Sequence, residues 1–428
     1  MRLKDAPGRF LKREYTVLVF MVVATFIANF SNYSFNVIAA RWLGKDDYGA
    51  LAALLSVFLI FSVPTTALQA IMAKYVAIYK VEGERARISS LLKGSLKLLL
   101  IIGLAVFVVF TAFSVPISRF MNVGSSASII VLGSAIAMAG LYPIFLGALQ
   151  GYQFFGHMGT NMMIQAFTRV IVGIVLIRIG WGIIGAMGAS TLALAAAMII
   201  AYFQGGTLFD LGLARERVDF REIFREFIPA IVILAIFWSF TGMDVVIAKR
   251  VLDPSPAGDY ACAVFMGKII LFLPTAVSMV MFPKTAEARA RQVRSLKVFF
   301  KYFLAGVALS GCAGVLFVTV PRTLITVLYG SEYLNAAAVM GMFGVAMTLY
   351  TAVNILIMYF ISIRATRTPI IIMAAALSAE VLMMSLFART PRQFALVHLL
   401  VAGALAVLLL LVTVGVRSQE KEWDDPEE

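Results

Sequence analysis

The chain has 428 residues, of which 61% are hydrophobic and only 14% are charged. This composition excludes an ordinary soluble protein and is typical of one that crosses a membrane many times. The formal net charge of +13 would suit a nucleic-acid-binding protein, but the charges lie between long apolar runs, so topology explains them better and no nucleic-acid partner is expected.

Twelve apolar segments follow one another along the chain. Their approximate bounds are 15–40, 48–78, 92–114, 125–150, 159–179, 182–207, 225–252, 255–285, 294–320, 332–362, 367–388 and 393–416. Each is long enough to cross a hydrocarbon core of about 30 Å as a helix. The first is too long for the apolar part of a signal peptide. We therefore predict an all-α polytopic membrane protein with 12 transmembrane helices.

The basic residues predict how these helices are oriented. If the N-terminus is cytoplasmic, 25 of the 36 Lys and Arg residues fall on the cytoplasmic side and 9 on the outer side. Membrane proteins keep this excess of Lys and Arg inside. We expect a multi-pass protein of the plasma (cytoplasmic) membrane with both termini cytoplasmic.

The chain contains one stretch twice. Residues 36–74 are echoed from Asp244 onward, with offsets of 209 to 212: Ile-Ala-x-Arg-x-Leu at 38–43 recurs at 247–252, and Asp-Tyr at 47–48 recurs at 259–260. A repeat of about half the chain length indicates two copies of one unit. Both copies enter the membrane from the cytoplasmic side, so the repeats are parallel.

This duplication predicts two lobes and a linker. We expect an N-lobe over 1–210 with helices 1–6, a cytoplasmic linker over 211–224, a C-lobe over 225–418 with helices 7–12, and an acidic cytoplasmic tail over 419–428. The stretch 208–227 has the composition of a short amphipathic helix on the inner leaflet.

Catalytic motifs are absent from the sequence. There is no phosphate-binding loop of the G-x-x-x-x-G-K-[ST] kind, and Cys262 and Cys312 suggest neither a disulfide nor a metal site. His157 and His398, the only histidines, have no second ligand at a zinc spacing. We expect no catalytic residue, no metal and no cofactor, and therefore a protein that is not an enzyme.

Two cations fall near the middle of predicted spans. They are Lys268 in span 8 and Arg169 in span 5. A charge at that depth costs roughly 2.5–3.5 kcal/mol on insertion scales, so it should face a cavity or a partner. The functional reading is an anion site; the alternative is a structural ion pair with Asp244 or Glu380.

Span 1 carries three amides. Asn29, Asn32 and Asn36 recur at spacings that place them on one helical face. Such a face turns away from lipid, toward a polar cavity or toward a neighbouring helix that it binds by ordinary hydrogen bonds.

The carboxylates Asp244 in span 7 and Glu380 in span 11 are candidates for ion coupling. A carboxylate in a membrane helix can exchange a proton or bind Na⁺, so coupling to H⁺ or Na⁺ is expected from these two. For Asp244 the alternative is a salt bridge to Lys249, Arg250 or Lys268.

Two pairs of basic residues occupy repeat-related positions. Lys74 and Lys284 fall at the inner ends of spans 2 and 8, where they either attract a phosphate head group or anchor the helices at the interface. Arg41 and Arg250 form a second pair at the outer ends.

Two prolines are also related by the repeat. Pro64 and Pro274 lie at matched places in spans 2 and 8. Proline removes a helix hydrogen bond, so both spans should be kinked or broken there. Matched breaks suit gating in a rocking transporter, or are static packing features.

Several of these motifs are similar to those of the polysaccharide-export branch of the multidrug/oligosaccharidyl-lipid/polysaccharide exporter superfamily, the oligosaccharide flippases. The similar residues are IAARWLGKDDYG at 38–49, D-x-x-I-A-x-R-x-L at 244–252, G-D-Y-x-x-A at 258–263 and L-P-T-A at 273–276. The resemblance implies two six-helix lobes around a central cavity and transport by alternating access.

The resemblance also implies a cargo. This would be a polyprenyl-diphosphate-linked oligosaccharide, moved from the inner to the outer leaflet for cell-surface polysaccharide biosynthesis, with other glycan-assembly proteins as further partners. By resemblance, Lys74, Lys268 and Arg169 would be cavity cations for the diphosphate. The alternatives are an ion-coupled multidrug exporter or a lipid II-type flippase of the same superfamily, a membrane sugar polymerase or glycosyltransferase, and a scaffold protein.

Overall fold

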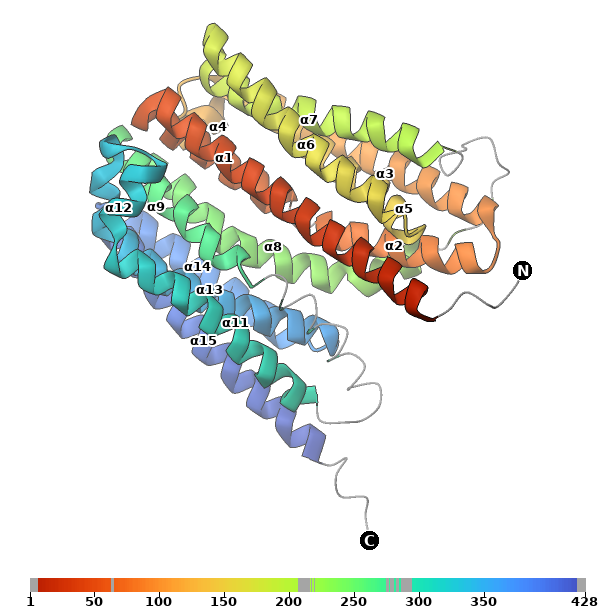
Figure 1. Cartoon of the computed structure of the whole chain (residues 1–428). Coiled ribbons are helices and arrows are strands. Elements are labelled where there is room, and N and C mark those ends of the chain that lie inside the picture. Colours follow the sequence, from red (N-terminus) through yellow and green to blue (C-terminus); the bar gives the residue numbers. More distant parts are fainter. Residues whose placement is uncertain are drawn as a thin grey trace. The chain divides into compact units, whose positions relative to one another are not determined.

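The fold comes from a computed structural model of the chain, shown in Figure 1. It describes residues 7–62, 65–206, 220–274 and 295–421, together with residues 216, 218, 277, 281 and 285. Every regular element within these residues is helical, which confirms the predicted all-α class.

The helices of the first half cover most of residues 7–205. They are α1 (Pro7–Ser62), α2 (Thr65–Val81), α3 (Arg85–Ala112), α4 (Ser114–Met121), α5 (Ser126–Gly151), α6 (Phe155–Leu176), the π-helical turn η1 (Ile177–Trp181) and α7 (Gly182–Gly205).

The second half has a similar series. Its helices are α8 (Phe220–Val251), α9 (Pro254–Phe272), α11 (Ser295–Thr319), α12 (Pro321–Leu328), the 3₁₀ turn η3 (Ser331–Ala336), α13 (Ala337–Ser362), α14 (Arg367–Phe387) and α15 (Pro391–Lys421). Helix α8 begins at Phe220, so the last residues of the predicted linker are continuous with this helix.

Nine stretches of the described residues are long and apolar enough to cross a membrane. Two of them are far longer than one crossing needs: Val23–Val81 has 59 residues and Phe155–Gly205 has 51. The first bends at Gly44 (φ 73°), and the second bends at Gly180 (φ 92°) within η1. A side chain at such a φ is strained, so glycine marks the break between two crossings. The protein is thus multi-pass, while the count of twelve stays a prediction.

The matched prolines coincide with helix interruptions. Helix α1 ends at Ser62 and α2 begins at Thr65, and Pro64 itself lies outside the described residues. Helix α9 ends at Phe272, and Pro274 lies in the turn that follows. Both interruptions are expected where proline removes a backbone donor.

The chain divides into two compact units. Unit 1 comprises residues 1–43 and 64–227, and unit 2 comprises residues 44–63 and 228–428. The segment 44–63, the first part of predicted span 2, therefore packs with the second unit. The lobe boundaries predicted from the repeat stay a prediction.

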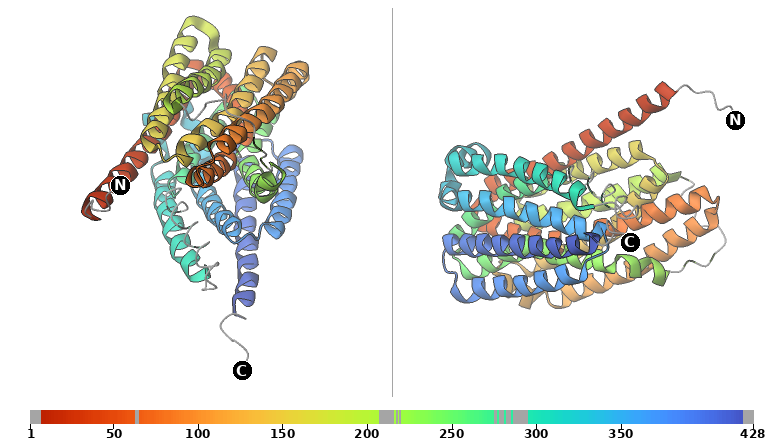
Figure 2. Two further views of the ribbon diagram at one scale, coloured as in Figure 1. Left: turned by 90° about the vertical axis from the view of Figure 1, so that its right-hand side faces the viewer. Right: turned by 90° about the horizontal axis from the view of Figure 1, so that it is seen from below.

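Within unit 1, α5 packs against α2, α3 and α7, and α6 packs against α7. Glycines on α5 allow the close approach of α2: a Cβ at Gly147 or at Gly151 would overlap atoms of Met72 or Val76. Figure 2 shows these helices from two further directions. Small residues at such contacts let helix backbones approach closely in a membrane.

Within unit 2, α13 is the central helix. It packs against α11, α15 and α9, and α14 packs against α15. Gly314 of α11 and Gly344 of α13 face one another so closely that a Cβ on either would crowd the carbonyl oxygen of the other. Glycine at the helix contacts thus allows close packing of helices within each of the two units.

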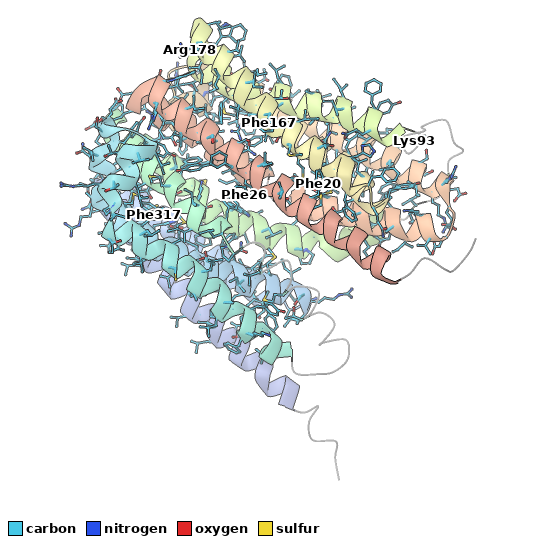
Figure 3. All side chains as sticks on the ribbon, in the orientation of Figure 1. Phe20, Phe26, Lys93, Phe167, Arg178 and Phe317 are labelled. Carbon is cyan, nitrogen blue, oxygen red and sulfur yellow. The ribbon has the colours of Figure 1, made fainter. Side chains whose placement is uncertain are left out.

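Large apolar side chains cover the outside of the helices. In unit 1, Phe26 is 69% exposed and Phe167 is 47% exposed, and Figure 3 shows both on α1 and α6. Exposed apolar side chains spread over this many helices are expected where the surrounding solvent is lipid.

Candidate functional site

Unit 1 brings two of the predicted residues together. Arg169 of α6 donates from Nη1 to the Oδ1 atom of Asn32 on α1, over 3.1 Å. Its guanidinium carbon lies 4.7 Å from the centre of the Phe35 ring. Its Nε is buried and has no hydrogen-bond partner among the described residues. Arg169 therefore keeps unused donor capacity among the described residues of unit 1.

The amides of α1 do not all behave alike. The Nδ2 atom of Asn36 donates to the backbone oxygen of Asn32 over 2.9 Å, and its Oδ1 has no partner among the described residues. Asn29 is exposed. Asn32 and Asn36 therefore belong to the surroundings of Arg169, whereas Asn29 makes no described contact with them.

The local sequence explains this arrangement. Gly173 lies four residues after Arg169, on the same face of α6, and a Cβ there would overlap the Phe35 ring. The missing side chain lets the ring lie against α6 beside the guanidinium group. The aromatic face then offsets part of the cost of the buried charge.

Unit 2 contains a larger polar group. Asp244 of α8 is buried, and its Oδ2 accepts a hydrogen bond of 3.1 Å from the hydroxyl of Tyr260 on α9. Its Oδ1 has no partner among the described residues. Lys249, an alternative partner for Asp244, donates instead to the backbone oxygen of Asp46 over 3.1 Å.

Lys268 of α9 is 4% exposed. Its Nζ lies 4.3 Å from the centre of the Phe265 ring and has no hydrogen-bond partner among the described residues. Asp244 is an electrostatic neighbour but not a hydrogen-bond partner. A buried amine that keeps all three donors unused costs free energy unless a ligand or water satisfies them.

Glu380 pairs with a residue to which the sequence assigned no role. Its Oε1 lies 2.7 Å from the Nδ1 atom of His398, and both side chains are buried. The His398 ring packs between Tyr350, at 4.7 Å, and Phe343, at 5.7 Å between ring centres. Its Nε2 has no partner among the described residues.

A sequence signal for this pair did exist. Glu380 precedes Phe387, the last residue of α14, by seven positions, and His398 follows Pro391, the first residue of α15, by seven. Two helices joined by a short turn run antiparallel, so residues equally far from the turn lie at the same depth. Two ionisable residues at matched depth in a membrane hairpin are expected to meet.

The other predicted cations are exposed or lie outside the described residues. Lys74 and Arg41 are exposed, and the Nζ atom of Lys74 lies 5.4 Å from the centre of the Tyr75 ring. Lys284 lies outside the described residues. Among the described residues no three His, Cys, Asp or Glu side chains are placed to hold a metal ion.

The fold is shared with known transporters. A multidrug resistance MATE family transporter of the MOP superfamily, in an inward-facing conformation, matches with a TM-score of 0.78 and 11% identity over 96% of this chain and 100% of that one. The lipid II flippase MurJ, in an inward closed conformation, matches with a TM-score of 0.71 and 18% identity over 93% and 87%.

A third matching structure is described by the polarity of its binding pocket. It is a MOP superfamily transporter from Pyrococcus furiosus Vc1 (DSM3638), with a TM-score of 0.66 and 15% identity over 94% of this chain and 95% of that one. That transporter is described as having a binding pocket of reversed polarity, which suggests a different function for it. At these identities the likeness establishes the fold alone, which is that of a multi-pass membrane protein.

The family follows from the sequence itself. The family described as "Polysaccharide biosynthesis protein" matches residues 12–289, which is more than half of the chain, and the chain therefore belongs to it. Its membership confirms the resemblance to polysaccharide exporters. The comparison with curated proteins gives no match.

Proposed function

We propose that this protein is a flippase that moves a polyprenyl-diphosphate-linked oligosaccharide from the inner to the outer leaflet of the plasma membrane by alternating access. The observation that carries the proposal is Lys268, a buried amine in a membrane helix whose Nζ has no hydrogen-bond partner among the described residues. Such a group stabilises a bound anion, because the anion supplies hydrogen-bond acceptors that the described residues do not supply.

Arg169 supports the same type of ligand. It is a second cation within a membrane helix, and its buried Nε is left without a partner in the described part of the chain. Arginine and lysine are the side chains that proteins use to bind diphosphates. Each unit thus contains one buried cation that can bind an anionic head group.

The physical need for a protein is clear for this cargo. A diphosphate-linked sugar cannot cross hydrocarbon unaided, because each desolvated charge costs many kcal/mol. A polar path with cations would replace the lost hydration while the lipid tail stays in the bilayer. Membership of the polysaccharide biosynthesis family supports a glycan as the other part of the cargo.

Directed movement needs a source of free energy. The sequence has no nucleotide-binding loop, so we infer coupling to an ion gradient through Asp244 and Glu380, with Pro64 and Pro274 as hinge points. Exposed Lys74, Arg41 and Arg250, together with Lys284, would attract the head group to the openings.

An ion-coupled exporter of cationic drugs is the second candidate. One observation favours it: Asp244 keeps a buried oxygen, Oδ1, that has no partner among the described residues. A buried carboxylate of this kind can bind an organic cation. The two candidates therefore differ in the sign of the cargo charge.

The test is transport by the reconstituted full-length protein. A polyprenyl-diphosphate oligosaccharide with a fluorescent label is placed in proteoliposomes, and an impermeant reductant quenches only the label on the outer leaflet. We expect the protein to increase the quenched fraction over protein-free vesicles. Export of cationic dyes without movement of the labelled lipid would contradict the proposal and favour the drug exporter.

A further inference from the structure

The pair formed by Glu380 and His398 is not required for the proposed binding of the cargo by Lys268 and Arg169. It is an acid and an imidazole joined over 2.7 Å in the interior of unit 2, with side chains 2% and 0% exposed. Histidine changes its charge near neutral pH, and a buried acid–histidine pair is a natural proton-binding site.

The surroundings of the pair hold few other ionisable groups. They come from three helices and comprise Tyr350 of α13, Asp244 of α8, and Tyr260 and Lys268 of α9. Asp244 interacts electrostatically with His398, Lys268 and Glu380. The charge on the pair is therefore linked to the charge of the residues proposed to bind the cargo.

The charges in this group balance only when the pair holds one proton. Asp244 and Lys268 can cancel one another, and one proton shared by Glu380 and His398 makes that pair neutral in either arrangement of the proton. Removing the proton leaves one net negative charge in the apolar interior, and adding a second leaves one positive charge. A net buried charge is costly, so the proton on the pair and an anion at Lys268 influence one another's binding.

Sodium fits this site poorly. Hard cations such as Na⁺ bind several oxygens, whereas imidazole nitrogen suits softer metals. One oxygen of Glu380 already contacts the His398 ring. Within the described residues no three acid, histidine or cysteine side chains converge as metal ligands.

We propose that Glu380 and His398 form the proton-binding site of this protein, so that H⁺, not Na⁺, is the ion coupled to transport. The coupling rests on the proposed transport function, whereas the binding of a proton by the pair does not. The step moves one proton from water on one side onto the pair and then to water on the other side, with no change of oxidation state.

The chain allows a direct test because it has only two histidines. His157 is exposed in unit 1, whereas His398 is buried in unit 2, so His157 can be replaced without removing a contact of His398. In full-length His157→Gln protein labelled with ¹⁵N-histidine and held in lipid nanodiscs, a single histidine, His398, gives the signal. Its ring nitrogens are followed by NMR from pH 5 to pH 9, with and without Na⁺.

We expect the His398 signal to change with pH, and Glu380→Gln to move the midpoint by about one pH unit or more, since removing a neighbouring charge has effects of this size. We also expect 100 mM Na⁺ to leave the signal unchanged at constant pH. A signal that is constant over the whole range, one that Glu380→Gln does not affect, or one that responds to Na⁺ would each overturn the proposal.

The test remains informative if the transport proposal fails. The NMR measurement needs no cargo, so a titrating, Glu380-dependent His398 signal supports the proton site even where no labelled lipid moves. Movement of the labelled lipid together with a His398 signal that does not change with pH would support the flippase function and exclude this pair from its mechanism.

Discussion

The polar groups of the two units differ in the chemistry of their side chains. In unit 1, Arg169 contacts Asn32, and no described residue supplies a carboxylate to it. In unit 2, Lys268 shares its surroundings with Asp244, Glu380 and His398. An arginine stays charged and an amide has no charge to lose, whereas carboxylates and histidine exchange protons.

The difference indicates a division of labour. On the proposed function, the group in unit 1 would bind an anion at any physiological pH but would not respond to a proton gradient. The group in unit 2 would do both. On this account, duplication supplied two similar frames, and substitutions in the second added coupling to a binding function that both retain.

The largest effect is expected for Lys268→Ala. Removing the buried amine should lower the rate of lipid-linked oligosaccharide translocation by about 30-fold or more, the effect of truncating a buried charged contact. Thermal stability should not fall, because Lys268 has no hydrogen-bond partner to lose among the described residues. Lys301→Ala is the control, because the side chain of Lys301 on α11 is exposed. Equal loss of transport and of stability would point to a structural role.

Asp244→Asn should separate transport from coupling. The substitution keeps the size of the side chain and the acceptor for the Tyr260 hydroxyl, but removes the charge. We expect cargo to move down its own gradient while stimulation by a pH gradient disappears. Asp253→Asn, exposed at the start of α9, should behave as wild type. Undiminished stimulation would exclude Asp244 from coupling.

In unit 1 the matched change is Arg169→Lys. Lysine keeps the charge but lacks the planar group that contacts both Asn32 and the Phe35 ring. Cargo affinity should fall by about tenfold, equivalent to roughly 1.4 kcal/mol, with no change in pH dependence. The control is Arg178→Lys, an exposed arginine beyond α6 that Figure 3 labels. A changed pH dependence would break the contrast between the units.

The smallest effect concerns packing around the unit 1 site. Gly173→Ala places a methyl group against the Phe35 ring, so we expect a loss of about 1–3 kcal/mol in unfolding free energy. Gly140→Ala is the control, since a Cβ there meets nothing within 4 Å and should be neutral or stabilising. Thermal unfolding in detergent measures both, and equal stability of the two variants would show that α6 tolerates the added volume.

Much of the fold follows from the sequence. Long apolar runs specify membrane helices because hydrocarbon leaves backbone groups no other partner, and the breaks near Pro64 and Pro274 follow from proline chemistry. The contacts between distant helices do not follow in this way. Asn32 and Arg169 are 137 residues apart, and only the packing of α1 on α6 brings them together.

The sequence indicates which residue types form the candidate site, but it does not indicate as well which residues contact one another there. Lys249 was weighed as a partner for Asp244, yet five residues along a helix place it about 140° around the axis, away from that carboxylate. The spacing of His398 along the sequence matches no zinc motif and does not reveal its partner. Comparing depth across the α14–α15 turn would have paired it with Glu380.

The most direct test of the division of labour is the stimulation of translocation by a pH gradient. It is the ratio of the rate of labelled-lipid movement with an imposed gradient to the rate without one, measured in the same proteoliposomes for wild type, Arg169→Ala and Glu380→Gln. The account predicts that Arg169→Ala lowers both rates and keeps the wild-type ratio, whereas Glu380→Gln brings the ratio to about 1. A wild-type ratio in Glu380→Gln, or a ratio lost equally in both variants, would contradict it.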